Sequence, residues 1–214
     1  MVMDNKTGVK SMGWRFIGVM ALAVSGGMFV SRAGAMVINP GDSFPTTGAG
    51  TFSGTVIDNE TSTFNSGSYI GSLHSQVYRE SDNYLDFVYQ FTNDNIPNAD
   101  SITTLSLSSF NYLWANADDK PVAGDVAPDT VSRTPVSSGD DTISFLFTTT
   151  GVAPGQTTDQ LVVQTHATSF YEGNASFLDT FGVSVQAPVP VPEPVSLSLL
   201  ATGAVALLIR RRRA

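Results

Sequence analysis

The chain has 214 residues, a formal net charge of −8 and no cysteine, which excludes disulfides, thiolate metal sites and a thiol nucleophile. The basic residues gather at the two ends, so that the stretch from Met36 to Pro192 has three Lys or Arg against seventeen Asp or Glu and a net charge of −14. Such an acidic middle repels phosphate backbones and argues against a nucleic-acid partner.

Residues 1–35 have the pattern of a signal peptide. A basic start is followed by an apolar stretch at 16–30, and Ala33-Gly34-Ala35 then supplies the small residues that signal peptidase requires. We expect a signal helix that is cleaved after Ala35, so that the exported protein begins at Met36. A permanent membrane anchor is the alternative, but the apolar stretch is short, interrupted by glycine and without a stop-transfer flank.

Residues 36–188 alternate between apolar and polar side chains, which is the period of a half-buried strand. Turn-forming residues separate the alternating stretches, and no long segment has the period of a helix. The predicted strands, of which the last three show the weaker pattern, lie at 85–92, 143–148, 161–167, 181–185, 50–57, 72–78 and 102–110. We therefore predict one all-β domain, an antiparallel β-sandwich of jelly-roll or immunoglobulin-like type, with Phe87 and Phe145 in its core.

Residues 115–141 interrupt this pattern, because they are rich in Asp and Pro. We predict a long polar loop or an irregular edge there. The segment contains two acid pairs, Asp118-Asp119 and Asp140-Asp141, and a glycosidase needs two carboxyl groups. Adjacent residues on a strand point to opposite faces, so we expect these residues to be solvated loop acids.

The sequence shows no catalytic constellation. His74 and His166 are out of phase with the apolar positions of their predicted strands, which places both on the solvent face. A G-x-S-x-G nucleophile elbow and an H-E-x-x-H zinc motif are both absent from the sequence. We expect no enzymatic activity, no catalytic residue and no cofactor.

Two binding chemistries stay open. Asn93-Asp94-Asn95 brings together oxygen ligands of the kind that calcium prefers, although the glycine and the terminal Glu of an EF-hand loop are missing. Trp114 and Phe170-Tyr171 could stack on sugar rings if they are exposed, but aromatic residues also fill sandwich cores.

Residues 189–214 form a predicted sorting tail. Prolines alternate along 188–194 and keep the backbone extended. The apolar stretch 195–209 would form a transmembrane helix of about 22 Å, which is short for a hydrocarbon core of about 30 Å. Arg210, Arg211, Arg212 and Arg213 should stay on the cytoplasmic side of the membrane.

The combination of Pro192-Glu193-Pro194, the short apolar helix and the terminal arginines resembles the PEP-CTERM sorting signal. The stretch 71–93 also looks like the body of PEP-CTERM proteins without a known activity. The resemblance implies that an exosortase recognises Pro192, Glu193 and Pro194. It also implies a transient stay in the inner membrane and passage to the outer surface of a bacterium that makes extracellular polysaccharide.

The leading functional hypothesis is therefore an exported surface or extracellular-matrix protein that associates with polysaccharide. A lectin-like module with a defined glycan site is the second hypothesis, and an exposed row of aromatic residues would favour it. A glycan hydrolase is the third, and two carboxyl groups facing each other across a cleft at about 5–10 Å would favour it.

Overall fold

The computed structural model describes residues 36–111, 113–135 and 141–191. The predicted signal peptide, the Pro-Glu-Pro box, the apolar helix and the arginine cluster all lie outside these residues, and they stay predictions. Within the described ranges, no helix is both long enough and apolar enough to cross a membrane.

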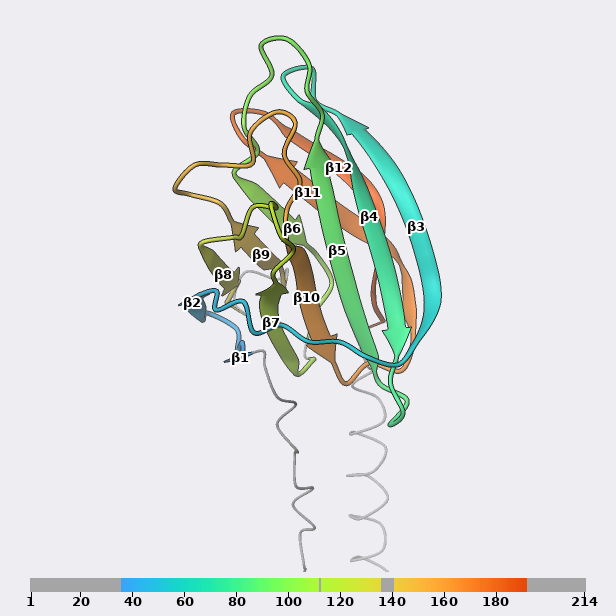
Figure 1. The fold of residues 1–214 in the computed structure, drawn as a ribbon. Helices are drawn as coiled ribbons and strands as arrows, with labels where there is room; N and C mark the ends of the chain where they lie inside the picture. The colour runs from blue at the N-terminus through green and yellow to red at the C-terminus, as the bar shows by residue number, and fades with distance from the viewer. Residues whose placement is uncertain (1–35, 112, 136–140, 192–214) are drawn as a thin grey trace, which may run out of the picture. The chain divides into compact units, whose positions relative to one another are not determined.

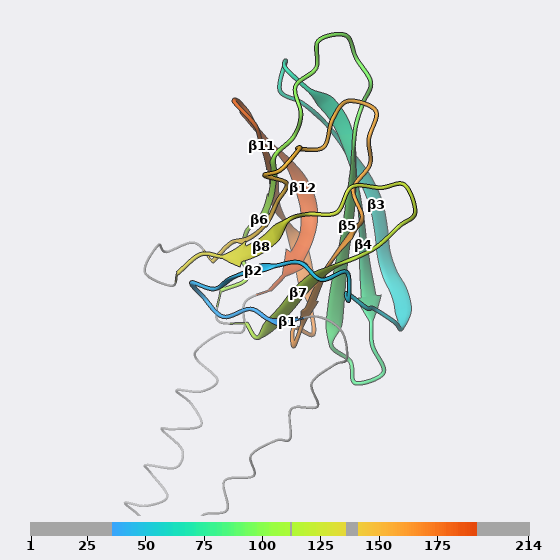
Figure 2. The ribbon, with the colours of Figure 1, turned by 60° about the vertical axis from the view of Figure 1, so that its left-hand side comes forward.

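The described residues form two antiparallel sheets of six strands each, and they contain no helix (Figure 1). Sheet A has the order β1-β7-β10-β5-β4-β3, and sheet B has the order β12-β11-β6-β9-β8-β2. The strands are β1 (Met36–Val37), β2 (Ser43–Pro45), β3 (Thr55–Asn65), β4 (Ile70–Arg79), β5 (Leu85–Asn93), β6 (Thr104–Leu107), β7 (Ala115–Lys120), β8 (Thr130–Arg133), β9 (Ile143–Leu146), β10 (Gln160–Thr165), β11 (Phe170–Leu178) and β12 (Gly182–Pro190). The two sheets form two layers in Figure 2, which confirms the predicted all-β class and the packing of two antiparallel sheets.

The core lies between the two sheets, where the inward side chains of each strand meet. Phe87 of sheet A and Phe145 of sheet B are both fully buried, as predicted. Phe91 joins the layers, since its ring contacts Phe147 and Phe177 at centroid distances of 5.6 and 5.2 Å. Such edge-to-face pairs add to the free energy that burial of the rings contributes.

The predicted polar loop over 115–141 is wrong, because β7 and β8 both lie within it. Asp118 and Asp119 belong to β7 and are only 1% and 2% exposed, so the expectation of solvated acids is wrong for this pair. Asp141 is also buried, in a bidentate ion pair with Arg133 at 2.6 and 2.7 Å. Asp140 lies outside the described residues.

Asp118 and Asp119 are buried because residues 46–54 form a strap over them. The strap crosses the outer face of sheet A in front of β7 and β10 (Figure 1). Thr47 donates from its N–H and its hydroxyl to Asp118, at 2.9 and 2.5 Å. The N–H of Gly50 donates to the backbone carbonyl of Asp119 at 2.8 Å. A sheet face that the alternation would leave in water is therefore covered by a segment distant in sequence.

The strap enters β3 through Gly54, which has a φ of +90°. A Cβ atom at this position would lie 2.3 Å from the carbonyl oxygen of Arg79. Only glycine fits such a close approach in a left-handed conformation.

Two strands, β3 and β12, are longer than the alternation predicted. β3 continues to Asn65 through a polar stretch, because it is the edge strand of sheet A and its outward positions are exposed. β11, which begins at Phe170, was not predicted as a strand. β12 runs to Pro190, two residues past the predicted domain boundary, and it is an edge strand, where proline can be accommodated.

Candidate functional site

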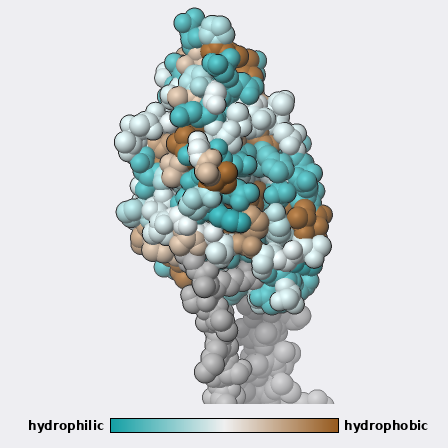
Figure 3. Space-filling model, viewed as in Figure 1, coloured by the Kyte–Doolittle hydropathy of each residue, from teal (hydrophilic) through white to brown (hydrophobic). Residues whose placement is uncertain are grey.

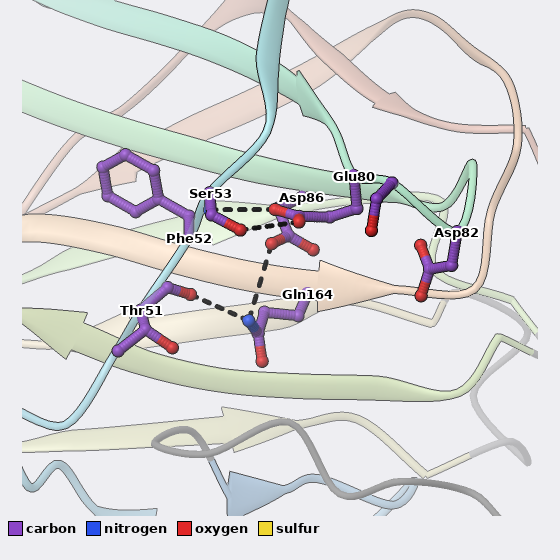
Figure 4. Close-up of a pocket in the computed structure, with 8 residues that line it drawn as sticks. Thr51, Phe52, Ser53, Glu80, Asp82, Asp86 and Gln164 are labelled. Carbon is purple, nitrogen blue, oxygen red and sulfur yellow. Dashed lines mark hydrogen bonds between the residues drawn. The ribbon is translucent and has the colours of Figure 1, made fainter.

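A polar pocket opens on the outer face of sheet A, between the strap and the turn that joins β4 to β5 (Figure 4). Its volume is about 300 Å³. The lining residues are Thr51, Phe52, Ser53, Glu80, Ser81, Asp82, Asp86 and Gln164. Four segments therefore build it: the strap, the β4–β5 turn, the start of β5 and the end of β10.

The floor of the pocket consists of polar side chains that are almost fully buried. Asp86 of β5 and Gln164 of β10 pair directly across the sheet, and they are 0% and 2% exposed. The Gln164 amide donates to the carbonyl of Thr51 at 2.8 Å and lies 3.5 Å from Asp86 Oδ2. The same row continues to Asn116 of β7, whose amide lies 3.4 Å from Gln164 Oε1 and whose own Oδ1 is buried without a hydrogen-bond partner among the described residues.

The rim of the pocket is shaped by the turn between β4 and β5. Its backbone closes with hydrogen bonds between Glu80 and Tyr84 and between Asn83 and Glu80, and Asn83 adopts a left-handed φ of 72° that asparagine tolerates. Glu80 accepts hydrogen bonds from the N–H and hydroxyl of Ser53, at 2.8 and 2.7 Å. Asp82 accepts from the N–H of Tyr84 at 3.1 Å. The turn thus brings acids to the strap.

A row of three stacked rings lies next to the floor row, one step further along the sheet. Tyr84, His166 and Trp114 each lie two residues beyond a member of the floor row, on the same face and at the same end of their strands. His166 stacks between the other two rings, at centroid distances of 4.6 Å to Tyr84 and 4.3 Å to Trp114. All three side chains are half-buried, so each keeps part of its surface in contact with solvent.

Both histidines lie on the outward face of sheet A, as predicted, but each is only partly exposed to solvent. His166 follows the end of β10 and is held in the ring stack just described. His74 is half-buried on β4, and its Nε2 lies 2.7 Å from Asn59 Oδ1.

The calcium candidates Asn93, Asp94 and Asn95 differ in how far they are buried. Asn93 is fully buried, and its amide donates to the backbone carbonyls of Asp100 and Val152 at 2.9 and 2.8 Å. Asp94 and Asn95 are exposed. Asn93 therefore fastens the loop that follows β5, and whether these residues bind calcium stays a prediction.

The aromatic residues that could stack on sugar rings also lie in different environments. Trp114 belongs to the ring row, whereas Phe170 packs partly buried against the core. Tyr171 is 41% exposed, and its hydroxyl donates to Ser109 at 2.7 Å.

The pocket residues were not found by the sequence reasoning. Asp86 and Gln164 could be assigned to the outer faces of their strands, but their burial depends on the strap and their proximity on the pairing of β5 with β10. Tyr84 and Glu80 lie in the β4–β5 turn, and no sequence pattern indicated that the strap would bind this turn.

Comparisons of the chain with family models, with curated proteins and with solved structures found no match.

Proposed function

We propose that the chain is an exported bacterial surface protein whose β-sandwich binds extracellular polysaccharide. The observation that carries the binding proposal is the acid-and-amide pocket beside the row of Tyr84, His166 and Trp114. Export rests on the N-terminal pattern and on the Pro192-Glu193-Pro194 box, whose resemblance to PEP-CTERM tails implies transient membrane residence and exosortase processing. The jelly-roll or immunoglobulin-like assignment is likewise part of the proposal.

Sugar is the ligand class that suits both halves of the site. A carboxylate has about four acceptor sites. Glu80 and Asp82 on the rim can therefore accept hydrogen bonds from sugar hydroxyls in addition to those from Ser53 and Tyr84. The apolar faces of a sugar ring pack against aromatic rings, and three rings lie in sequence next to the floor row of the pocket. A volume of about 300 Å³ is at the lower end of the range for small-molecule sites, which suits one saccharide unit at a time.

The charge of the pocket narrows the class further. Glu80, Asp82 and Asp86 line the pocket, and among the described residues no lysine or arginine does. Acidic saccharides are therefore repelled, and neutral or amino-bearing units are preferred. The face of the molecule in Figure 3 is mostly hydrophilic with scattered apolar residues, which suits contact with a hydrated polymer better than docking onto a lipid surface.

A defined site is favoured over loose matrix association because the pocket floor is already organised by hydrogen bonds. A hydrolase is not proposed. The Glu80 carboxylate is occupied by two hydrogen bonds from Ser53, and Asp86 lies fully buried beneath the pocket surface.

Binding of neutral, amino-bearing and acidic oligosaccharides to the full-length protein in mild detergent tests the proposal, with calorimetry as the readout. We expect neutral or amino-bearing oligosaccharides to bind, and Trp114→Ala and Gln164→Ala each to weaken binding by at least tenfold. Tyr171→Ala is the control, since it removes an exposed aromatic residue of sheet B. Failure of every oligosaccharide class to bind, or unchanged binding in both pocket variants, would refute the proposal.

A further inference from the structure

Three carboxylates from the two sheets meet at a second place, outside the pocket. Asp58 and Glu60 lie on β3 of sheet A, and Glu172 lies on β11 of sheet B. One oxygen from each lies within 4.8 Å of the other two. Two of the oxygens of this group, Asp58 Oδ2 and Glu60 Oε1, are buried and have no hydrogen-bond partner among the described residues.

A buried serine lies beside this group. Ser75 of β4 pairs directly with Glu60, on the inward face that Leu73 and Val77 also occupy, and it is only 1% exposed. The two buried carboxylate oxygens without a partner are the observation that calls for a ligand. A buried polar group without a partner costs about 1–3 kcal/mol, so such groups normally have a ligand, a water or an ion.

We propose that Asp58, Glu60 and Glu172 bind one calcium ion between the sheets, with Ser75 as a further oxygen ligand. Calcium takes six to eight oxygen ligands at about 2.3–2.6 Å, so two of its ligands can lie up to about 5 Å apart. Magnesium demands near-ideal octahedral geometry at about 2.0–2.1 Å and usually keeps several waters, so a group of carboxylates from two sheets suits calcium better. All the protein ligands are oxygens, which disfavours zinc and copper.

The electrostatics of the group favour a cation. Burial raises the pKa of Glu60, and the neighbouring Glu172 and Asp58 carboxylates raise it further. Tyr89 pairs with Ser75 across the sheet, and burial together with Glu172 and Glu60 raises its pKa well above 10. The charged groups that raise the pKa of Glu60 are both carboxylates, and a divalent cation would offset their repulsion.

The ion would join the edge of sheet A to sheet B. β3 is the last strand of sheet A, and Ser62 already donates from its hydroxyl to the carbonyl of Gln186 on β12 at 3.0 Å. A calcium bridge between β3 and β11 would reinforce this contact with three charged ligands. It would therefore hold the two layers together in a calcium-containing medium outside the cell.

Thermal unfolding of the full-length protein in mild detergent, with EDTA or with calcium chloride, tests the proposal. At a calcium concentration about a hundredfold above the Kd we expect Tm to rise by about 5–10 °C. Calorimetry should give one site per chain, with magnesium binding at least tenfold more weakly. Equal Tm values in EDTA and in calcium would overturn the proposal.

Variants locate the ion. Glu60→Gln should abolish the calcium-dependent rise while leaving Tm in EDTA unchanged or higher, because one repelling charge is removed. Asp58→Asn, at a half-exposed position of the edge strand, is the second variant and should behave in the same way.

Two controls separate this group from the other acidic places. Asp94→Asn lies in the 93–95 loop and Asp82→Asn lines the pocket, and both should retain the full rise. Loss of the rise in either control, with retention in Glu60→Gln and Asp58→Asn, would place the calcium elsewhere and overturn the proposal.

Discussion

At the scale of single residues, the domain is unusual in how many charged side chains it buries. Arg133 and Asp141 are each 3% exposed, and Arg133 also donates to the carbonyls of Ile38 and Phe110 at 3.0 and 2.8 Å. All the described partners of this guanidinium are thus oxygens from three distant segments. A buried pair with such complete hydrogen bonding fixes the geometry of the fold, whatever its net contribution to stability.

Asp119 is the residue through which stability should depend on pH. Burial raises its pKa from 3.8 to about 6, with Asp118 and Asp159 adding to the rise while the Gly48 N–H lowers it. The folded state therefore holds a proton that the unfolded chain releases, and this stabilisation is fully present below about pH 4. It is lost as the pH rises through about 6, and it amounts to up to about 3 kcal/mol.

We predict that Asp119→Asn removes the contribution of this residue, so that the free energy of unfolding in urea falls less between pH 4 and 6.5 than it does in the wild type. Asp129→Asn is the opposite control, because hydrogen bonds from Thr149 lower the pKa of Asp129. That variant should lose stability at neutral pH and little at pH 3. A wild-type protein that gains stability between pH 4 and 6.5, together with an unchanged slope in Asp119→Asn, would contradict the assignment.

At the scale of elements, the strap 46–54 shields part of the outward face of sheet A from solvent. It is hydrogen-bonded to Asp118 and Gln164 on the outward face of sheet A, and it also forms one wall of the pocket. Its attachment to the sheet depends on a few hydrogen bonds and on the sharp entry into β3 at Gly54.

Gly54→Ala tests the strap, and Gly67→Ala is its matched control. The two glycines have φ values of +90° and +89°, so both substitutions add the same backbone strain of about 1–2 kcal/mol. Gly67 has open space around a Cβ atom, whereas at Gly54 the new atom would lie 2.3 Å from the Arg79 carbonyl oxygen. We expect Gly54→Ala to cost at least about 2 kcal/mol more in urea unfolding and to weaken oligosaccharide binding as well. Equal costs in the two variants would mean that the close approach is not maintained in solution.

At the scale of the whole molecule, the last strand ties the tail to the core. β12 pairs with β11 as far as Pro190, and the Tyr89 hydroxyl donates to the carbonyl of Pro188. The Pro192-Glu193-Pro194 box therefore begins two residues after the last strand residue. A processing enzyme would have to act close to the folded domain.

We predict that the secreted protein begins at Met36 and lacks Arg210–Ala214. Glu193→Ala should impair removal of the tail, because it removes the only charge in the proline-rich segment 188–194, whereas Asp94→Ala, an exposed acid within the domain, should not. Mass spectrometry of the secreted and membrane-bound forms measures both ends. A secreted form that retains Met1 or Arg213-Ala214 would contradict the proposed export route.

Local patterns in the chain were enough to predict the all-β class and part of the core. The alternation of Leu85, Phe87, Tyr89 and Phe91 is a local property of the chain, and all four side chains are fully buried as the period of two requires. The same reasoning found Phe145, because a strand with one buried face shows its orientation in its own residues. The N-terminal and C-terminal patterns are also local, and they carry the predictions on export.

Which polar residues are buried, and which of them lie together, depends on contacts between segments that are distant in the chain. Asp118 and Asp119 read as loop acids because the Thr47 and Gly48 donors that satisfy them lie about seventy residues earlier in the chain. Asp86 and Gln164 are 78 residues apart and become the pocket floor only through the pairing of β5 with β10. Asp58, Glu60 and Glu172 come together only because the edges of the two sheets approach each other. Long-range pairing and coverage leave no periodic trace in the sequence, since each residue carries information about its own face but not about the segment that will lie against it.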